Sequence, residues 1–403
     1  MTRIPPTLSA LLLLAALPSR AGDFETEDFA LRFSAALSRL STYPDAAGQA
    51  GASVASSRST SINPAALAWR PLYTWNGTDT YGAAASGQFT GISFDRGTDL
   101  SATTQSLNFY PTAHLALKLS ATQLRSNESR RRDGGIFEVD ANVYRFDLAR
   151  RFDGRVHPFS LGLQFSYSQT ETNVSLPRGD YPVPTSRGPV LRPFRKQVLG
   201  DSDRESFGLR FGWQMSLRGP ETHATPTGEG KASVAAELLP SQQYDIWLLG
   251  LSVDYAYQPT RLGKYSAHPA VVEGAPGKFV PRDYHQLFLR AGTAWRYTPL
   301  AWAEKKRAGY LRLDYQWGWL SSGSSELQVH RLYLGGNYPL HAMLDLNAGA
   351  VVDDRRHVAW STGFSFKLPN LAIEAAYQYD ILPEISSDFG HSDTIVVSIG
   401  FAF

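Results

Sequence analysis

Residues 310–319 read YLRLDYQWGW, and this stretch decides the fold class. From Leu311 to Trp319 every second residue is large and apolar, while Arg312 and Asp314 lie between them. Alternation with a period of two places the apolar side chains on one face of a β-strand and the polar ones on the other. The stretch therefore predicts a strand that meets an apolar environment on one side and water on the other.

The same alternation recurs through the last three quarters of the chain, for example at 207–215, 247–257, 358–366 and 371–379. Many of these segments end in Trp or Tyr, whose rings favour the two interfaces of a bilayer. A soluble β-sandwich also alternates, but its strands are shorter and its inner faces rarely end in so many large aromatics. The sequence predicts an all-β fold, a transmembrane antiparallel β-barrel over residues 81–403.

Fourteen segments alternate in this way, an even number, as single-chain bacterial barrels require. They are 82–95, 101–111, 113–124, 136–152, 158–173, 204–218, 243–258, 283–297, 308–320, 327–339, 342–353, 357–368, 370–381 and 392–403. The long connections 125–135, 174–203, 259–282 and 382–391 all follow odd-numbered strands, so they are expected on one rim, outside the cell. Segment 219–242 is either a long periplasmic excursion or part of a further strand.

Two segments depart from simple alternation. In 136–152 the apolar phase changes between Val143 and Phe146, which predicts a β-bulge. Segment 82–95 consists mostly of Gly, Ala and Ser. A wall with so few large side chains lets another group approach closely.

Composition excludes several other classes of protein. The 403 residues are 19% charged and 12% aromatic, which argues against disorder. The mature chain has no run of roughly 20 apolar residues, which excludes a polytopic helical membrane protein. The absence of Cys excludes disulfides, thiolate chemistry and Cys-ligated zinc.

Residues 1–21 have the features of a signal peptide, with Arg3 before the apolar stretch 8–17 and small residues near position 21. Removing Arg3 and Arg20 from the 39 basic residues leaves 37, which balances the 37 acidic ones. A neutral mature chain gives no electrostatic reason to expect a nucleic-acid partner.

The chain ends in an alternating series that runs through Ile395 and Phe401 to Phe403. This ending resembles the C-terminal signal by which bacterial outer-membrane barrels are recognised for assembly. The expected location is the outer membrane of a Gram-negative bacterium. The expected partners are the barrel assembly machinery, through Phe403, together with outer-membrane lipid and lipopolysaccharide.

Residues 22–80 do not alternate, and they are either a disordered periplasmic tail or a plug inside the lumen. Fourteen strands enclose more space than inward side chains can fill, which favours the plug. Segments 48–53 (GQAGAS) and 61–68 (SINPAALA) resemble the N-terminal hatch of the FadL-like outer-membrane long-chain fatty acid transporter family. The resemblance implies that Asn63, Pro64 and Ala65 belong to a hatch. It also implies that apolar molecules are taken up past that hatch and leave sideways.

Several residues on the inward phase of the predicted strands are apolar, and these are the candidate substrate-binding residues: Ile246, Leu248, Phe288, Tyr333, Met343 and Val396. A dry inward cluster can bind a hydrophobic ligand. The alternative is that these side chains pack against the plug. The inward charges are mixed in sign, which favours a structural ladder of ion pairs over a selectivity ring. They are Arg210, Asp254, Arg290, Arg312, Asp314, Arg331, Asp345, Lys367, Glu374 and Asp380.

Loop 177–196 carries five basic residues, namely Arg178, Arg187, Arg192, Arg195 and Lys196, against the single acidic Asp180. Such a lip can meet lipopolysaccharide phosphates or collect anionic amphiphiles. The alternative is an ordinary solvated outer loop.

The sequence lacks the parts of an enzyme, with no Gly-x-Ser-x-Gly, no His-Glu-x-x-His and no phosphate loop. No metal site or cofactor is expected. The function predicted from the sequence is passive uptake of hydrophobic compounds such as long-chain fatty acids or hydrocarbons. A non-transporting barrel that serves as a docking or assembly scaffold is the alternative, and an outer-membrane enzyme ranks third.

Overall fold

The computed structural model describes residues 47, 49, 52, 54, 55, 62–69 and most of 82–402. Within 82–402 the gaps are 96–97, 113, 127–128, 131–135, 153–156, 177–178, 184–189, 195–197, 219–244, 260–263, 268–282, 298–308, 323–324, 342, 355–356, 369–370 and 383–389. Among the residues so described, no helix is long and apolar enough to cross a membrane.

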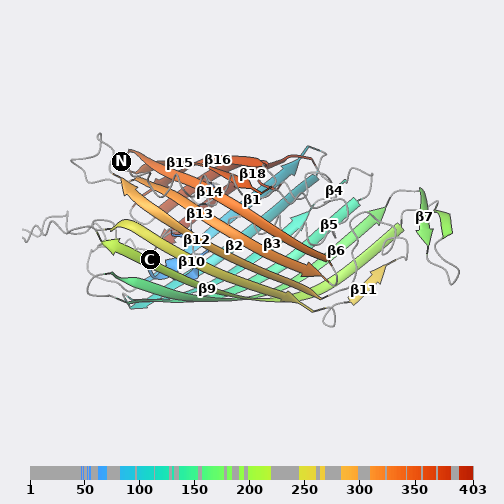
Figure 1. Cartoon of the computed structure of the whole chain (residues 1–403), viewed down its shortest axis with the longest axis horizontal. Helices are drawn as coiled ribbons and strands as arrows, with labels where there is room; N and C mark the ends of the chain where they lie inside the picture. The colour runs from blue at the N-terminus through green and yellow to red at the C-terminus, as the bar shows by residue number, and fades with distance from the viewer. Residues whose placement is uncertain are drawn as a thin grey trace, which may run out of the picture.

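The described chain forms one closed antiparallel barrel (Figure 1). Its strands are β1 (Gly82–Phe94), β2 (Thr98–Thr112), β3 (Leu115–Ser126), β4 (Ser129–Arg130), β5 (Ile136–Phe152), β6 (Phe159–Leu176), β7 (Gly179–Val183), β8 (Val190–Phe194), β9 (Val198–Arg218), β10 (Asp245–Gln258), β11 (Lys264–Ala267), β12 (Tyr284–Tyr297), β13 (Gly309–Ser322), β14 (Ser325–His341), β15 (Leu344–Asp353), β16 (Val358–Lys367), β17 (Leu371–Tyr379) and β18 (Ser392–Ala402).

Closure comes from pairing of the first strand with the last, since β1 lies antiparallel to β18 over residues 84–94. The sheet contains 16 strands, of which β4 and β11 are short additions at the rim. The remaining fourteen form the wall, which confirms the predicted strand number and fold class. Strands β7 and β8 pair only with each other, in a hairpin beyond one end of the barrel (Figure 1).

The outer face of the wall is apolar, as the alternation predicts. Side chains such as Phe165, Leu209 and Ile395 are 45–54% exposed although they are large and apolar. A soluble monomer rarely exposes so continuous an apolar surface, and a lipid-facing barrel does so throughout its membrane band.

The β-bulge predicted within 136–152 is wrong. The register between β5 and β6 runs without a shift from Ile136 to Phe152. Val139 and Ala141 are buried inside the barrel, whereas Tyr144 and Phe146 are exposed on its outer face. Seventeen residues span roughly 55 Å at about 3.3 Å each, which exceeds the ~30 Å hydrocarbon layer. The apolar phase therefore changes because one unbroken strand has apolar residues facing the barrel interior in its first part and apolar residues on the outer face in its second part.

The connections of the barrel differ between its two rims. Those after β6, β10 and β17 lie on one rim, here called the long-loop rim, as predicted for connections that follow odd-numbered strands. The opposite rim carries shorter turns such as 112–115, 341–344 and 367–371. Segment 219–242 and the terminal Phe403 lie outside the described residues.

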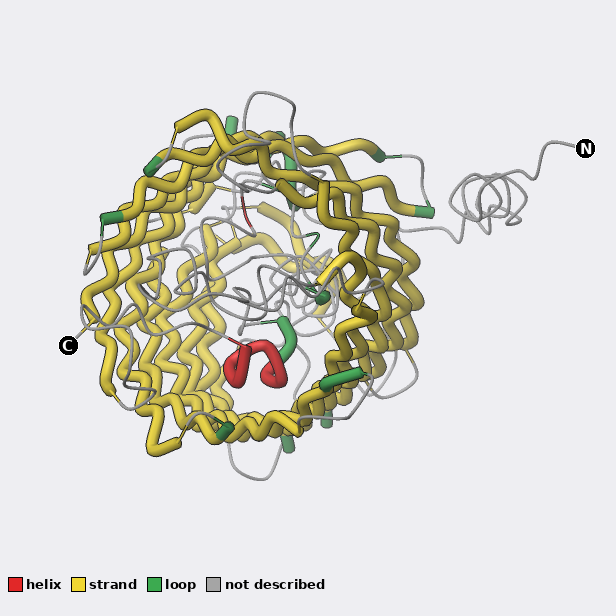
Figure 2. The backbone as a smooth tube through the Cα atoms, turned by 90° about the vertical axis from the view of Figure 1, so that its left-hand side faces the viewer, coloured by secondary structure: helices red, strands yellow, loops and turns green. Residues whose placement is uncertain are grey.

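The described residues upstream of β1 lie within the ring of strands (Figure 2). They include the short 3-10 helix η2 (Pro64–Trp69), whose Leu67 packs on Tyr110, Ala116 and Ala149 of the wall. The name hatch is used below for these upstream described residues, namely 47, 49, 52, 54, 55 and 62–69.

Candidate functional site

Three neighbouring strands, β12, β13 and β14, present successive layers of side chains to the lumen because they pair in continuous register. From the long-loop rim inward, the layers are Gln286–Leu320–Leu327, then Phe288–Gly318–Val329, then Arg290–Gln316–Arg331, then Gly292–Asp314–Tyr333. The upper two layers are mainly apolar and the lower two are mainly polar. A ligand that enters from this rim meets the apolar layers first.

The apolar layers form one buried cluster with the first residue of β12. Its members are Tyr284, Phe288, Leu320, Leu327 and Val329, each no more than 7% exposed. Gly318 is required for this packing, since a Cβ there would fall within 3 Å of the Phe288 ring and of the Val329 side chain. This set is called the apolar cluster below.

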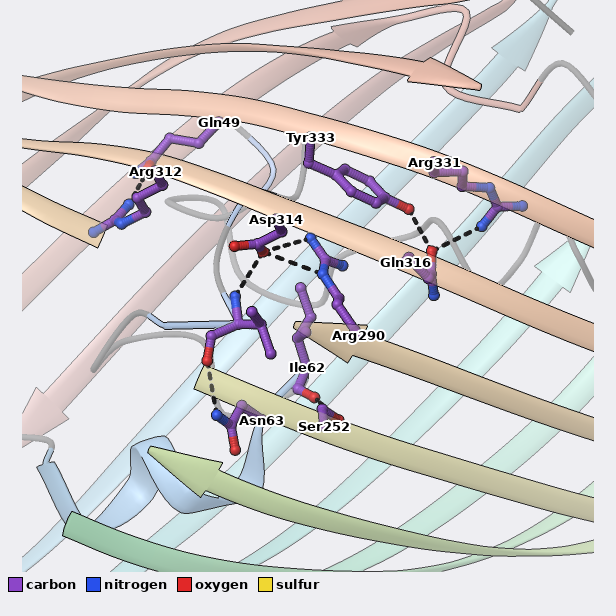
Figure 3. Close-up of polar contacts among 11 residues, drawn as sticks. Gln49, Ile62, Asn63, Ser252, Arg290, Arg312, Asp314, Gln316, Arg331 and Tyr333 are labelled. Carbon is purple, nitrogen blue, oxygen red and sulfur yellow. Dashed lines mark hydrogen bonds and ion pairs between the residues drawn. The ribbon is translucent and has the colours of Figure 1, made fainter. Parts of the chain in front are cut away.

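Beneath the apolar cluster lies a chain of polar contacts (Figure 3). The Tyr333 hydroxyl donates to Gln316 Oε1 at 2.6 Å, and Arg331 donates to the same oxygen at 3.3 Å. The Arg290 guanidinium lies 4.0 Å from the centre of the Tyr333 ring, a cation–π contact. Arg290 also donates from two nitrogens to Asp314 Oδ2, at 3.1 and 2.9 Å.

Around Asn63, the hatch contacts the wall through backbone groups and a short side chain. Asn63 Nδ2 donates to Val54 O at 2.7 Å and to Trp213 O of β9 at 3.1 Å. Asn63 Oδ1 accepts from Ala65 N at 3.1 Å, which turns the chain into η2. All three predicted hatch residues, Asn63, Pro64 and Ala65, are buried against wall strands.

Glycines in the wall allow this close approach. A Cβ at Gly212 of β9 would fall within 3 Å of Asn63, Pro64 and Ala65. A Cβ at Gly335 of β14 would lie 2.7 Å from Gln49. Because real Cβ atoms do not approach so closely, side chains at these positions would push the hatch off the wall.

The structure brings only some of the predicted substrate-binding residues together. Phe288 belongs to the apolar cluster, and Tyr333 lies two layers below it. Leu248 packs instead on Ala55 of the hatch, and Val396 packs on Ala47. The alternative interpretation, packing against the plug, therefore describes the surroundings of Leu248 and Val396.

Two of these predicted positions lie elsewhere. The prediction that Met343 points inward is wrong: it is 40% exposed, in the turn between β14 and β15. Strand periodicity does not extend into a turn, which is why the inward phase fails there. Ile246 lies in β10 where the register with β9 shifts between Asp245 and Trp247, and its side chain is outside the described part.

The inward charges form ion pairs, as the mixed signs predict. Besides Arg290 and Asp314, the wall holds Arg210 with Asp254 at 2.5 Å and Lys367 with Asp345 at 2.7 Å. Arg312 donates to Gln49 of the hatch. Of the predicted basic lip, Arg178, Arg187, Arg195 and Lys196 lie outside the described residues, and Arg192 is described only by its backbone in β8.

Sequence reasoning missed Tyr284, Leu320, Leu327 and Val329 as partners of Phe288. The signal was present, since Leu320 continues the inward phase of Arg312 and Asp314, and Val329 shares the phase of Tyr333. What periodicity does not supply is the register that places these residues side by side.

A hollow lies in the wall itself, where β1, β2, β3, β5 and β18 meet. It is an open depression of about 600 Å³. Small residues such as Ala85, Gly87 and Ala121 line it together with Leu107 and Tyr144, which are exposed on the outer face. The Gly- and Ala-rich segment 82–95 thus forms a thin part of the wall, as the sequence predicts.

The described residues contain no group of three or more His, Asp or Glu side chains that could hold a metal ion. The consecutive residues 391–393 (His-Ser-Asp) have the residue types of a catalytic triad, but each binds a different partner. His391 binds Asp380, Ser392 accepts a hydrogen bond from Leu382 N, and Asp393 accepts one from Tyr377. The site offers an apolar cluster for contact with a hydrophobic group and a polar layer with hydrogen-bonding groups below it.

No protein-family model and no curated protein matches the sequence. Solved structures do match the fold. The CymD monoaromatic hydrocarbon channel superposes with a TM-score of 0.52 at 13% identity, over 90% of this chain and 97% of that chain. A FadL homologue from Pseudomonas aeruginosa gives 0.50 at 14% identity, over 90% and 98%. The chain has the fold of the FadL-type transporters.

The Ralstonia pickettii toluene transporter TbuX gives a TM-score of 0.49 at 14% identity, over 90% of this chain and 98% of that chain. At such low identities the likeness concerns the fold. A FadL-type barrel has the architecture expected from the SINPAALA stretch at 61–68, and the fold resemblance drawn from the sequence is confirmed.

Proposed function

We propose that this FadL-type barrel is an outer-membrane channel for the passive uptake of hydrophobic compounds, such as long-chain fatty acids or hydrocarbons, and is not an enzyme. The observation that carries the proposal is the apolar cluster of β12–β14, because five buried apolar side chains face the lumen near one rim. A pore for ions or sugars needs a polar lining at this point. The monoaromatic hydrocarbon channel CymD and the FadL homologue, which share the fold, support the same class of ligand.

The hatch supports a path that leaves the lumen sideways. Described hatch residues touch wall strands from β2 round to β18, and we propose that they obstruct a straight axial route. The depression beside Ala85 and Gly87 is the thin part of the wall. We propose that ligand passes from the apolar cluster to this part of the wall and enters the lipid there.

The test is equilibrium binding of a fluorescent long-chain fatty acid to detergent-purified protein, with alkanes and aromatic hydrocarbons as competitors. Phe288→Arg places a charge within the apolar cluster, and we expect binding to weaken about tenfold or more. The matched control is Ser168→Arg, which places the same charge on the hydroxyl-lined side of the lumen, where Ser168 bonds Ser206. Binding by this control should stay within about twofold of the parent.

Absence of binding by any apolar ligand to a heat-modifiable, folded barrel would contradict the uptake proposal. It would favour the scaffold alternative, which the packing of Leu248 and Val396 against the hatch also fits. In either case the apolar outer face fits outer-membrane lipid, with lipopolysaccharide at the long-loop rim as the proposed neighbour. The barrel assembly machinery remains the proposed partner of Phe403.

A further inference from the structure

One carboxylate oxygen joins the hatch to the wall. Asp314 of β13 is fully buried, and its Oδ2 accepts a hydrogen bond from Val54 N at 2.8 Å. The same oxygen accepts the two bonds from Arg290 of β12 (Figure 3). Val54 and Asp314 are 260 residues apart, so this bond ties the upstream segment to the middle of the barrel wall.

Arg290 holds Asp314 in this position. It is only 7% exposed, and its guanidinium is confined between the Asp314 carboxylate and the face of Tyr333. A carboxylate accepts a stronger bond from a backbone N–H than a neutral acceptor does, and the two bonds from Arg290 fix the orientation of this carboxylate. The strength of the bond to Val54 therefore depends on Arg290.

Two other hatch contacts nearby are made by neutral groups, while Arg312 of β13 also donates to Gln49. Asn63 binds Val54 O, and Ser252 of β10 donates to Ile62 O at 2.7 Å. Neutral hydrogen bonds contribute roughly half as much as charge-assisted ones. The contact through Asp314 is thus one of two charge-assisted contacts described between β13 and the hatch, and it lies directly below the layers that a ligand would fill.

We propose that Asp314 is the latch that holds the hatch closed and that Arg290 is its positioning residue. Filling of the apolar cluster displaces Tyr333 and Arg290, weakens the bond from Val54 to Asp314, and frees the hatch for passage. Only this last step rests on the proposed function. The latch itself is a statement about how the hatch is held when no ligand is bound.

The experiment uses the fact that the chain has no Cys. Ala55→Cys places one thiol on the hatch, where Ala55 is 1% exposed against Leu248 and Ala294. In this background Asp314→Asn keeps an oxygen acceptor but removes the charge. We expect maleimide to label the thiol about tenfold faster, or more, than in the Ala55→Cys parent, without ligand present.

The matched control is Asp345→Asn, which removes a similarly buried charge from an ion pair between the wall strands β15 and β16. Its labelling rate should equal that of the parent. If Asp314→Asn folds and labels no faster than the parent, the latch is wrong. If Asp314→Asn does not fold, Arg290→Lys decides, because Lys keeps the charge and lacks the planar fork. A severalfold rise in the rate of maleimide labelling of the Arg290→Lys variant supports the latch, and an unchanged labelling rate overturns it.

Uptake is measured separately, with a fluorescent fatty acid and vesicles that contain each variant. Faster labelling with faster uptake supports the latch and its place in transport. Faster labelling with unchanged uptake supports the latch, and it counts against the proposed role of the hatch in uptake.

Discussion

Gly318 shows how one missing side chain shapes the candidate site. The Phe288 ring and the Val329 side chain occupy the space that a Cβ at Gly318 would need. We expect Gly318→Ala to displace Phe288 and to weaken binding of the fluorescent fatty acid roughly tenfold, since misplaced aromatic packing costs about 1–3 kcal/mol. The control is Gly400→Ala, because the nearest atoms to a Cβ at Gly400 would lie at ordinary van der Waals distances of 3.7 and 3.9 Å. Equal affinities for the two variants would show that Phe288 does not contact the ligand.

Asp380 is the other residue with an unusual local setting. It lies just beyond the end of β17 with a left-handed φ of 51°, which Asp tolerates better than most residues. Its Oδ2 binds His357 Nε2 at 2.6 Å and His391 Nδ1 at 2.9 Å. The next two residues, Ile381 and Leu382, are fully buried, so this cluster fixes the start of the long loop before β18.

The cluster predicts a dependence on pH. The hydrogen bond to Asp380 raises the pKa of His391. The stabilisation of the loop by this bond is therefore complete below about pH 6.5, and it is lost as pH rises through the raised pKa. Burial raises the pKa of Asp380, but the hydrogen bonds from both His side chains outweigh it and lower the pKa below 3.8. The stabilisation of the loop by ionised Asp380 is lost only as pH falls through this lowered pKa.

We therefore expect the loop to be held most firmly between about pH 4 and 6.5. Hydrogen exchange of the Leu382 amide, which donates to Ser392 Oγ at 3.3 Å, is the measurement. Exchange protection should peak in this range and decline on either side, and Asp380→Asn should flatten the profile. A profile that keeps its peak in Asp380→Asn would assign it to other groups.

At the level of elements, the described hatch residues make polar bonds to many points of the wall. Asn63→Ala removes donors from two buried carbonyls, those of Val54 and Trp213, and removes the acceptor for Ala65 N. Buried groups left without a partner cost about 1–3 kcal/mol, so we expect η2 to detach locally while the barrel stays intact. Limited proteolysis followed by mass spectrometry should find new cuts near residue 63 and none in the wall strands. Parent-like resistance would mean that the remaining contacts of η2, such as the packing of Leu67 and the bonds to Ser160, hold the segment.

Elements with strict alternation were predictable from the sequence, and their mutual contacts were not. The outward face of β13 follows from Leu311 to Trp319 alone, because one period and one apolar environment define it. The apolar cluster needs the registers of β12, β13 and β14 together, and a shift by one residue would send Phe288 to the lipid face. The bond from Val54 to Asp314 crosses 260 positions and carries no local pattern. The change of phase in β5 was misread because one strand crosses two environments.

In the whole molecule, the closure of the wall and the packing of the hatch against it rest on different contacts. The wall closes through the pairing of β1 with β18, which places the small residues of β1 beside the last strand. The hatch packs against the inside of that wall with contacts spread from β2 to β18. Because the β1–β18 pairing does not involve the hatch, we expect an assembly defect and a hatch defect to be separable by experiment.

Phe403 allows this separation to be tested. In the sequence it follows the alternating residues Ile395, Val397, Ile399 and Phe401, which are exposed on the outer face of β18. Phe403 itself lies outside the described residues. If this ending is a recognition signal, Phe403→Ala slows assembly in cells, and we expect a severalfold drop in heat-modifiable barrel in the outer membrane. The same variant refolded from urea into detergent should match the parent in heat-modifiability and in fatty acid binding, because the wall and the apolar cluster do not depend on the signal. A refolding defect equal to the cellular one would place the role of Phe403 in the closed seam between β1 and β18.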